Sequence, residues 1–327
     1  MSRRTLAALC LGIALAASAT PASAAAIDQA VAAWARHMVQ YGARHCAELE
    51  DPRLSADDRL AATYYDQVRV MLGIADYTGQ SRWRDCATRA RAAYRDAYVL
   101  ANDAQVPGYW NFTTGLRLDF ERTGDLVSRR AVIKLAENGL YCRDTTPIDS
   151  TTSHIRSREV AYCIVAFINA QALGAPVRVR RAIMVAQAYD HLEQWFVRFQ
   201  WSGDELAPFM VGLTAHALIR DWEQTRDPRL IPALRRAADW LWAHAWLPSE
   251  RAMWYRSNER LKGAPDLNLL VAPIYAFLYR QTGESAYRIA GDELFEGGVA
   301  LAWLDGPKQF NQQYWWSFDF VRWRFKG

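Results

Sequence analysis

The sequence lacks the short motifs that mark several large enzyme classes. It has no HExxH motif and no pair of histidines at helical spacing, and its 6 histidines are scattered, so a catalytic zinc is not expected. It has no P-loop and no GxGxxG fingerprint. The segment 79–83 begins like the GxSxG nucleophile turn of serine hydrolases but has Trp83 in place of the second glycine. We therefore expect no metal and no cofactor.

The chain also lacks a strong charge of either sign and any long apolar run after its N-terminus. Its 39 basic and 35 acidic residues give a net charge of +4, which does not favour a nucleic-acid partner. No later stretch approaches the roughly 20 apolar residues of a membrane span. The sequence predicts neither a nucleic-acid partner nor a spanning helix.

The N-terminus has the three parts of a secretory signal peptide. Arg3 and Arg4 form a basic start, residues 6–17 are apolar, and Ala22-Ser23-Ala24 is a small-residue cleavage site. A membrane anchor is the weaker alternative because the apolar run is short. We expect residues 1–24 to be removed and the protein to be exported, to the periplasm or beyond the cell. The mature chain then carries a net charge of +2.

The four cysteines after the signal peptide favour two disulfides, since their number is even and the chain is expected to be exported. Three connectivities are open. We favour Cys46–Cys86 with Cys142–Cys163, because each pair joins neighbouring segments. Four buried free thiols are the alternative.

Strand signals are scarce, whereas helical spacing recurs along the chain. There is no Asn-Gly hairpin turn, and alternation is weak outside the C-terminal tail. The segment 264–296 shows the pattern that recurs, an apolar helix, a Thr-Gly turn and a second helix starting near Ser285. Its apolar positions have one-face helical spacing: Leu267, Leu270, Val271, Ile274, Tyr275 and Leu278. The sequence predicts an all-α protein.

Similar turns divide the chain into five helical hairpins. They lie at 78–79, 123–124, 174, 226–227 and 282–283, roughly 45 to 56 residues apart, as in helical arrays. A helix at 27–46 and an aromatic tail at 308–327 remain unpaired. If these two pack together they form a sixth pair and close the array into a ring, which hides the apolar ends of an open array.

This alternation, with turns such as Thr282-Gly283-Glu284 and Thr123-Gly124-Asp125, resembles the (α/α)6 toroid of six-hairpin glycosidases and polysaccharide lyases. The resemblance implies a single α/α-toroid domain over residues 25–327. Short alginate lyases with a related barrel carry Asn-Asn-His before a Tyr-Trp pair. Here Val-Pro-Gly precedes Tyr109-Trp110, so that subfamily is not supported. The resemblance also implies that the Thr-Gly turns occupy one rim, and that functional residues precede the inner helices at the other.

Segments before the expected inner helices hold three candidate catalytic carboxylates. We predict Asp66 and Asp266 as the acid/base pair of a glycosidase, with Glu159 as substitute. A helix cap is the alternative role for Asp266, and an ion pair with Arg156 or Arg158 is the alternative for Glu159. Asp66 falls inside a helical pattern, so capping does not explain it.

The same segments hold flat aromatic side chains that could stack on sugar rings and polar groups that could bind them. For each tryptophan the alternative is that it fills the core, and for His154 that it has no role. The predicted substrate-binding residues are Tyr65, Tyr109, Trp110, His154, Arg158, Trp201, Asp204, Tyr255, Arg256, Asn268, Trp315 and Trp316.

These residues favour an exported enzyme that hydrolyses a polysaccharide or oligosaccharide. The first alternative is a polysaccharide lyase for a uronate polymer, with His154 or a tyrosine as base and arginines against the uronate carboxylate. The second is a non-catalytic helical-repeat protein of the cell envelope that binds a glycan or a protein partner.

Overall fold

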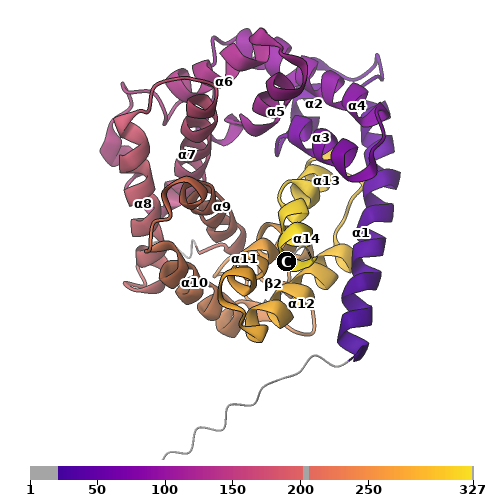
Figure 1. Cartoon of the computed structure of the whole chain (residues 1–327), viewed down its shortest axis with the longest axis vertical. Helices are drawn as coiled ribbons and strands as arrows, with labels where there is room; N and C mark the ends of the chain where they lie inside the picture. The colour runs from indigo at the N-terminus through magenta and orange to yellow at the C-terminus, as the bar shows by residue number, and fades with distance from the viewer. Residues whose placement is uncertain (1–20, 202–205, 326–327) are drawn as a thin grey trace, which may run out of the picture.

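The structure is a computed structural model that describes residues 21–201 and 206–325, and almost all of its regular structure is helical (Figure 1). Most of the predicted signal peptide lies outside these ranges, as does Asp204, so the signal peptide stays a prediction. None of the helices described is both long enough and apolar enough to cross a membrane. The predicted all-α class is confirmed.

All five predicted hairpins are present, each as two helices joined by a short turn and packed together. They are α3 (Gln67–Thr78) with α4 (Arg82–Arg91), α5 (Thr114–Thr123) with α6 (Leu126–Asn138), α7 (Ser157–Ala172) with α8 (Val179–Phe196), α9 (Pro208–Thr225) with α10 (Leu230–His244), and α11 (Ala272–Thr282) with α12 (Ser285–Leu301). After α4 the helix continues as a π-helical segment, η1 (Ala92–Leu100).

Four of these turns share one hydrogen-bonding design. In each, a threonine hydroxyl donates to the carbonyl four residues earlier and accepts the N–H two residues later, as Thr282 does with Leu278 O (2.8 Å) and Glu284 N (3.2 Å). The next residue is left-handed, which glycine adopts without strain. The threonine and left-handed residue are Thr78 and Gly79, Thr123 and Gly124, Thr225 and Arg226, and Thr282 and Gly283.

The hairpins follow one another around the molecule. Helices α3, α5, α7, α9 and α11 each contact the next in that order, and in Figure 1 they lie nearer the middle of the view than α6, α8, α10 and α12. Two C-terminal helices continue the row, since α14 (Ser317–Phe325) contacts α11 and α13 (Pro307–Tyr314) contacts α3.

The N-terminal helix α1 (Pro21–Glu48) packs on the C-terminal part of the chain, as the sequence predicted. It contacts α12, α13 and α3. Buried hydrogen bonds join the two ends of the chain: Trp34 Nε1 donates to Ser317 Oγ (3.0 Å), and the Tyr314 hydroxyl donates to Trp34 O (2.9 Å). The aromatic tail therefore serves as core between the first helix and the last hairpin.

Irregular segments precede the helices of the inner row. They contain the elements α2 (Ala56–Ala62), η2 (Gly108–Trp110), η3 (Ile148–Thr151), η4 (His154–Arg156), η6 (Pro265–Leu270), β1 (Trp246–Leu247) and β2 (Ala252–Met253). The two strands are antiparallel, with Trp246 opposite Met253. These segments carry most of the residues that the sequence singles out.

Both favoured disulfides are present. Cys46–Cys86 joins α1 to α4, and Cys142–Cys163 joins the segment after α6 to α7, each with Cα atoms 5.3 Å apart. A disulfide stabilises a fold by about 2–4 kcal/mol, chiefly by restricting the unfolded chain. The first bridge anchors α1, the helix that must hold the C-terminal segment.

Candidate functional site

The segments before four of the inner helices meet at one place, which we call the mouth. It consists of two adjoining hollows of about 250 and 270 Å3 that share Arg158, Phe209 and Tyr255. The first hollow is also lined by Tyr64, Tyr65, Ala264, Asp266, Leu267, Lys308, Gln309 and Gln312. The second is also lined by His154, Ile155, Ala207, Met210 and Arg256. The convergence agrees with the prediction that polar and aromatic residues gather before the inner helices.

Arg158 is the central cation of the mouth. It lies in the first turn of α7, and its Nη2 donates to Glu159 Oε1 at 3.0 Å. Burial disfavours its charge, but Glu159 and Tyr64 outweigh that cost and raise the pKa of Arg158. The guanidinium also lies over the ring of Tyr109, 5.3 Å from its centroid. Arg158 is therefore a fixed, permanently charged donor between the two hollows.

Three tyrosines line the same hollows as Arg158. Tyr64 and Tyr65 contact each other edge to face, with ring centroids 4.9 Å apart. Tyr255 stacks on Phe209, with centroids 5.7 Å apart and planes within 10°. Burial raises the pKa values of Tyr64 and Tyr65, so both phenols are protonated at neutral pH and can donate hydrogen bonds.

The described lining of the mouth carries more positive than negative charge. Its cations are Arg158, Arg256 and Lys308, and the one carboxylate among the lining residues that the structure describes is Asp266. Asp266 accepts a hydrogen bond from Trp303 N (2.7 Å). Burial raises the pKa of Asp266, and that hydrogen bond opposes the rise. The lining suits a ligand that bears carboxylate or sulfate groups.

Asp66 lies next to the mouth but is not among its lining residues. The expectation of an unbroken helix around Asp66 is wrong: α2 ends at Ala62, and Asp66 caps α3. Its Oδ1 accepts Arg69 N (3.2 Å) and its Oδ2 accepts Gly115 N (2.9 Å). Burial raises the pKa of Asp66, against the effect of these hydrogen bonds. Both oxygens of its carboxylate are thus occupied by backbone donors.

The backbone at this corner is strained. Tyr65 and Asp66 have φ of 63° and 55°, and two consecutive left-handed residues without a glycine are unusual. Each such residue costs roughly 1–3 kcal/mol and persists only where the surrounding structure enforces it. The corner turns the chain from α2 into α3 and brings Tyr64 and Tyr65 to the mouth.

Glu159, the third predicted carboxylate, is buried beside Arg158. Only 3% of the residue is exposed, and its described partner is the Arg158 guanidinium, as the ion-pair alternative proposed. It is not among the lining residues of the mouth. In this arrangement Glu159 orients a cation, and its own carboxylate is not part of the lining of either hollow.

Five predicted substrate-binding residues line the mouth, and a sixth is its neighbour. Those that line it are Tyr65, His154, Arg158, Tyr255 and Arg256. Tyr109 is 40% exposed and contacts Arg158 through its ring. His154 is oriented by Gln194, whose Oε1 lies 3.1 Å from its Nδ1, while its buried Nε2 has no hydrogen-bond partner among the described residues.

Five further predicted binding residues fall within the fold, whereas Asp204 lies outside the described residues. Trp110 packs edge to face on Tyr64, and Trp201 donates from Nε1 to Trp195 O (2.9 Å). Asn268 is buried, and its amide donates to Arg251 O and Leu294 O. Trp315 and Trp316 are buried against His216, with centroids 4.4 and 5.1 Å from its ring. For the tryptophans this is the core-filling role given above as the alternative.

Sequence reasoning missed the contribution of α13 to the mouth. Lys308, Gln309 and Gln312 lie on one face of that helix, at i, i+1 and i+4, and Gln312 Nε2 donates to Asp266 O. The spacing is present in the sequence, but the many aromatic residues that follow give the tail the pattern of a core segment. Phe209 was missed because a single phenylalanine before a helix has no distinguishing pattern.

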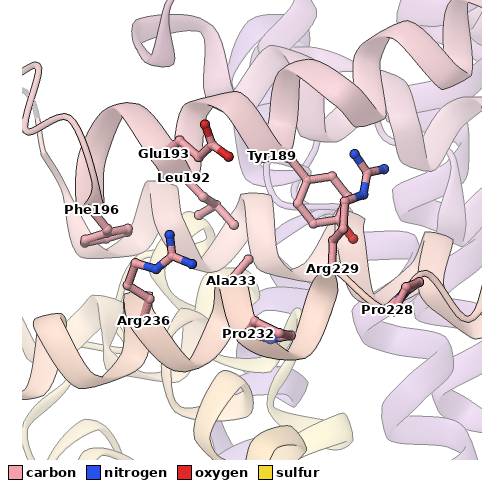
Figure 2. Close-up of a pocket in the computed structure, with 9 residues that line it drawn as sticks. All are labelled: Tyr189, Leu192, Glu193, Phe196, Pro228, Arg229, Pro232, Ala233 and Arg236. Atoms are coloured by element: carbon pink, nitrogen blue, oxygen red, sulfur yellow. The ribbon is translucent and has the colours of Figure 1, made fainter.

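Larger hollows lie outside the mouth. One, of about 430 Å3, runs between α8 and α10 and is lined mostly by apolar atoms of residues such as Leu192, Phe196 and Ala233 (Figure 2). Two of its three charged residues, Glu193 and Arg229, pair with Arg198 and Asp227, and the third is Arg236. None of the predicted site residues lies in it. We assign the candidate site to the mouth, where several segments converge and charged groups are partly buried.

Comparisons with known protein families, with characterised proteins and with solved structures find nothing that matches this chain. Among the described residues, no group of three or more His, Cys, Asp and Glu side chains is placed to hold a metal ion. The chemistry of the mouth is therefore the basis for assigning a function.

Proposed function

We propose that this chain is an exported carbohydrate-active enzyme that binds an acidic polysaccharide at the mouth of an α/α toroid. The contacts of the inner row and the packing of α1 on the C-terminal helices support the toroid. The two disulfides are compatible with export. The cationic lining, with tyrosines on several sides, supports an acidic sugar polymer as substrate.

The choice of reaction rests on the position of Arg158, a charged donor that lines both hollows. A guanidinium can bind a uronate carboxylate in a bidentate manner and stabilise the negative charge that develops when the neighbouring C5–H is removed. In such an elimination a base takes the C5 proton, the C4–O bond breaks, a C4=C5 double bond forms, and the leaving oxygen takes a proton. Tyr65 lines the first hollow with Arg158, and its protonated phenol can give the proton to the leaving oxygen. His154 and Tyr255 line the second hollow with Arg158 and are the candidates for the base that takes the C5 proton.

Hydrolysis, which the sequence favoured, is the second candidate. Asp266 supports it, because burial raises the pKa of this carboxyl group as a general acid requires. A glycosidase needs a second carboxylate within about 5–10 Å of the first. Among the described residues that line the mouth there is none, so elimination becomes the first proposal and hydrolysis the second.

A substrate screen separates the candidates. The purified protein is incubated with uronate polymers and with neutral polysaccharides, and two products are followed: new reducing ends and the ultraviolet absorbance of an unsaturated uronate. Elimination produces both signals from an acidic polymer. Hydrolysis produces reducing ends without absorbance. Binding without either product would favour the non-catalytic alternative.

Two variants link the activity to the mouth. Arg158→Ala should abolish product formation, because it removes the central cation. Arg229→Ala is the matched control, since it removes an arginine from the hollow between α8 and α10 (Figure 2). Equal activities of the two variants would rule out the mouth as the site.

A further inference from the structure

The corner between α2 and α3 is held from two sides by groups that belong to other parts of the chain. On one side Gly115 N, at the start of α5, donates to Asp66 Oδ2. On the other side the Asn311 amide of α13 donates to Ala62 O (2.8 Å) and Tyr64 O (2.9 Å). Two helices that are distant in sequence thus fix the backbone immediately before and after Tyr65.

The contact between Asp66 and Gly115 leaves no room for a larger residue. A Cβ atom at Gly115 would lie 2.3 Å from Asp66 Oδ1 and 2.5 Å from Arg69 N. The φ of Gly115 lies outside the left-handed range that favours glycine, so the glycine is needed here for close approach. The corner is therefore enforced by dedicated contacts, as a strained backbone requires.

The two carboxylate oxygens of Asp66 have separable tasks. Oδ1 caps α3 through Arg69 N, which any good N-cap residue could do. Oδ2 reaches across to α5 through Gly115 N. Only the second contact ties the corner to a neighbouring helix.

We infer that Asp66 is a positioning residue: its Oδ2 bond to Gly115 holds the left-handed corner that places Tyr65 in the mouth. The inference differs from the catalytic role that the sequence suggested for Asp66. Its kinetic consequence rests on the proposed function, but its structural consequence does not. A tyrosine beside Arg158 transfers protons efficiently only when its hydroxyl is held in place, and a misplacement of about 1 Å can cost 100-fold in rate.

The test uses Asp66→Asn. Asparagine tolerates the left-handed conformation and keeps an acceptor for Arg69 N, so it preserves the helix cap. Its amide nitrogen would then face Gly115 N, which is also a donor, so the hydrogen bond between the corner and α5 is lost. The matched control is Asp103→Asn, since Asp103 and Ala104 form a second left-handed pair, with φ of 48° and 59°, and neither residue lines the mouth. Gly115→Ala disrupts the same contact from the side of α5.

The first readout does not depend on activity. In protein labelled with 13C in its tyrosine rings, the Tyr65 signal is assigned by its loss in Tyr65→Phe. We expect Asp66→Asn and Gly115→Ala to shift or broaden this signal, and Asp103→Asn to leave it unchanged. An unchanged Tyr65 signal in folded Asp66→Asn protein would overturn the inference.

The second readout is kinetic. On a uronate polymer that the wild type cleaves, turnover of Asp66→Asn should fall about 100-fold, whereas the dissociation constant of an oligosaccharide should change little because Arg158 is intact. In a Tyr65→Phe background, Asp66→Asn should cost little more, since the two residues act together. Additive losses would contradict the inference. If the wild type cleaves no acidic polymer, the proposed function fails, and the Tyr65 signal still decides the role of Asp66.

Discussion

The two ends of the inner helices differ in how they use glycine. At the Thr-Gly turns, Gly79, Gly124 and Gly283 have φ of 70° to 74° and open space around them, so they are needed for backbone conformation. Near the mouth, Gly115 and Gly212 have ordinary φ values, and an added Cβ would lie 2.3 and 2.0 Å from other atoms. One end is a repeated local motif, and the other is a set of unique close contacts.

The difference explains where function can arise. The turns repeat one hydrogen-bonding pattern within a few residues, so each can form independently of the rest of the fold. The mouth depends on contacts between segments far apart in sequence, such as Asp66 with Gly115 and Gln312 with Asp266. Such contacts can differ from one hairpin to the next, and they allow an asymmetric site on a repetitive scaffold.

The largest expected effect is at the mouth. Arg158→Lys keeps the positive charge but removes the planar fork, and we expect turnover on an acidic polymer to fall by about 100- to 1,000-fold, as when an oxyanion donor is removed. Arg229→Lys, in the hollow between α8 and α10, should retain full activity. Steady-state kinetics on both variants provides the measurement, and wild-type turnover in Arg158→Lys would contradict the assignment.

Exchanging glycine for alanine at each end tests the comparison directly. Gly115→Ala should lower the free energy of unfolding by about 1–3 kcal/mol through overpacking and also reduce activity. Gly79→Ala should lower it by about 1–2 kcal/mol through the left-handed penalty alone. Urea unfolding and turnover, measured on both variants, separate the two mechanisms. A loss of activity in Gly79→Ala at a temperature where it is folded would contradict the view that the turns serve structure alone.

The threonines of the turns should matter for stability only. Thr282→Val removes the hydroxyl that bonds Leu278 O and Glu284 N, while it keeps the shape of the side chain. We expect the free energy of unfolding to fall by about 1 kcal/mol. Thermal or urea unfolding would measure this, and turnover should match that of the wild type.

The smallest effect concerns pH at the turn between α9 and α10. The Arg229 guanidinium, hydrogen-bonded to Asp227, holds the pKa of that carboxyl group below its usual value. Its stabilising contribution is therefore present above the unfolded pKa of about 4 and is lost as the pH falls through the folded pKa. Asp227→Asn should destabilise by less than about 1 kcal/mol at pH 7.

Below the folded pKa of Asp227, the wild type and Asp227→Asn should have the same stability, because the carboxyl group is then protonated in both the folded and unfolded wild-type protein. Urea unfolding at pH 7 and at about pH 2.5 tests this, provided that both proteins remain folded at the lower pH. If the stability difference between the two proteins grows on acidification, ionised Asp227 does not stabilise the fold.

Patterns along the chain predict the features that depend on sequence neighbours. Threonine, glycine and apolar spacing predict the five hairpins and their turns. The disulfide pairs were also predicted, since each joins segments that lie near each other in the chain.

Contacts between distant segments decide which polar residues are available for chemistry. Asp66, Glu159 and Asn268 have the same side chains whether they face a hollow or a partner within the fold. Their hydrogen-bond partners, whether donors or acceptors, come from other segments or from an adjacent arginine. Helical spacing sets the face of a residue on its own helix but not the neighbour opposite it. The mouth is assembled from such neighbours, and for that reason its members could be predicted only in part.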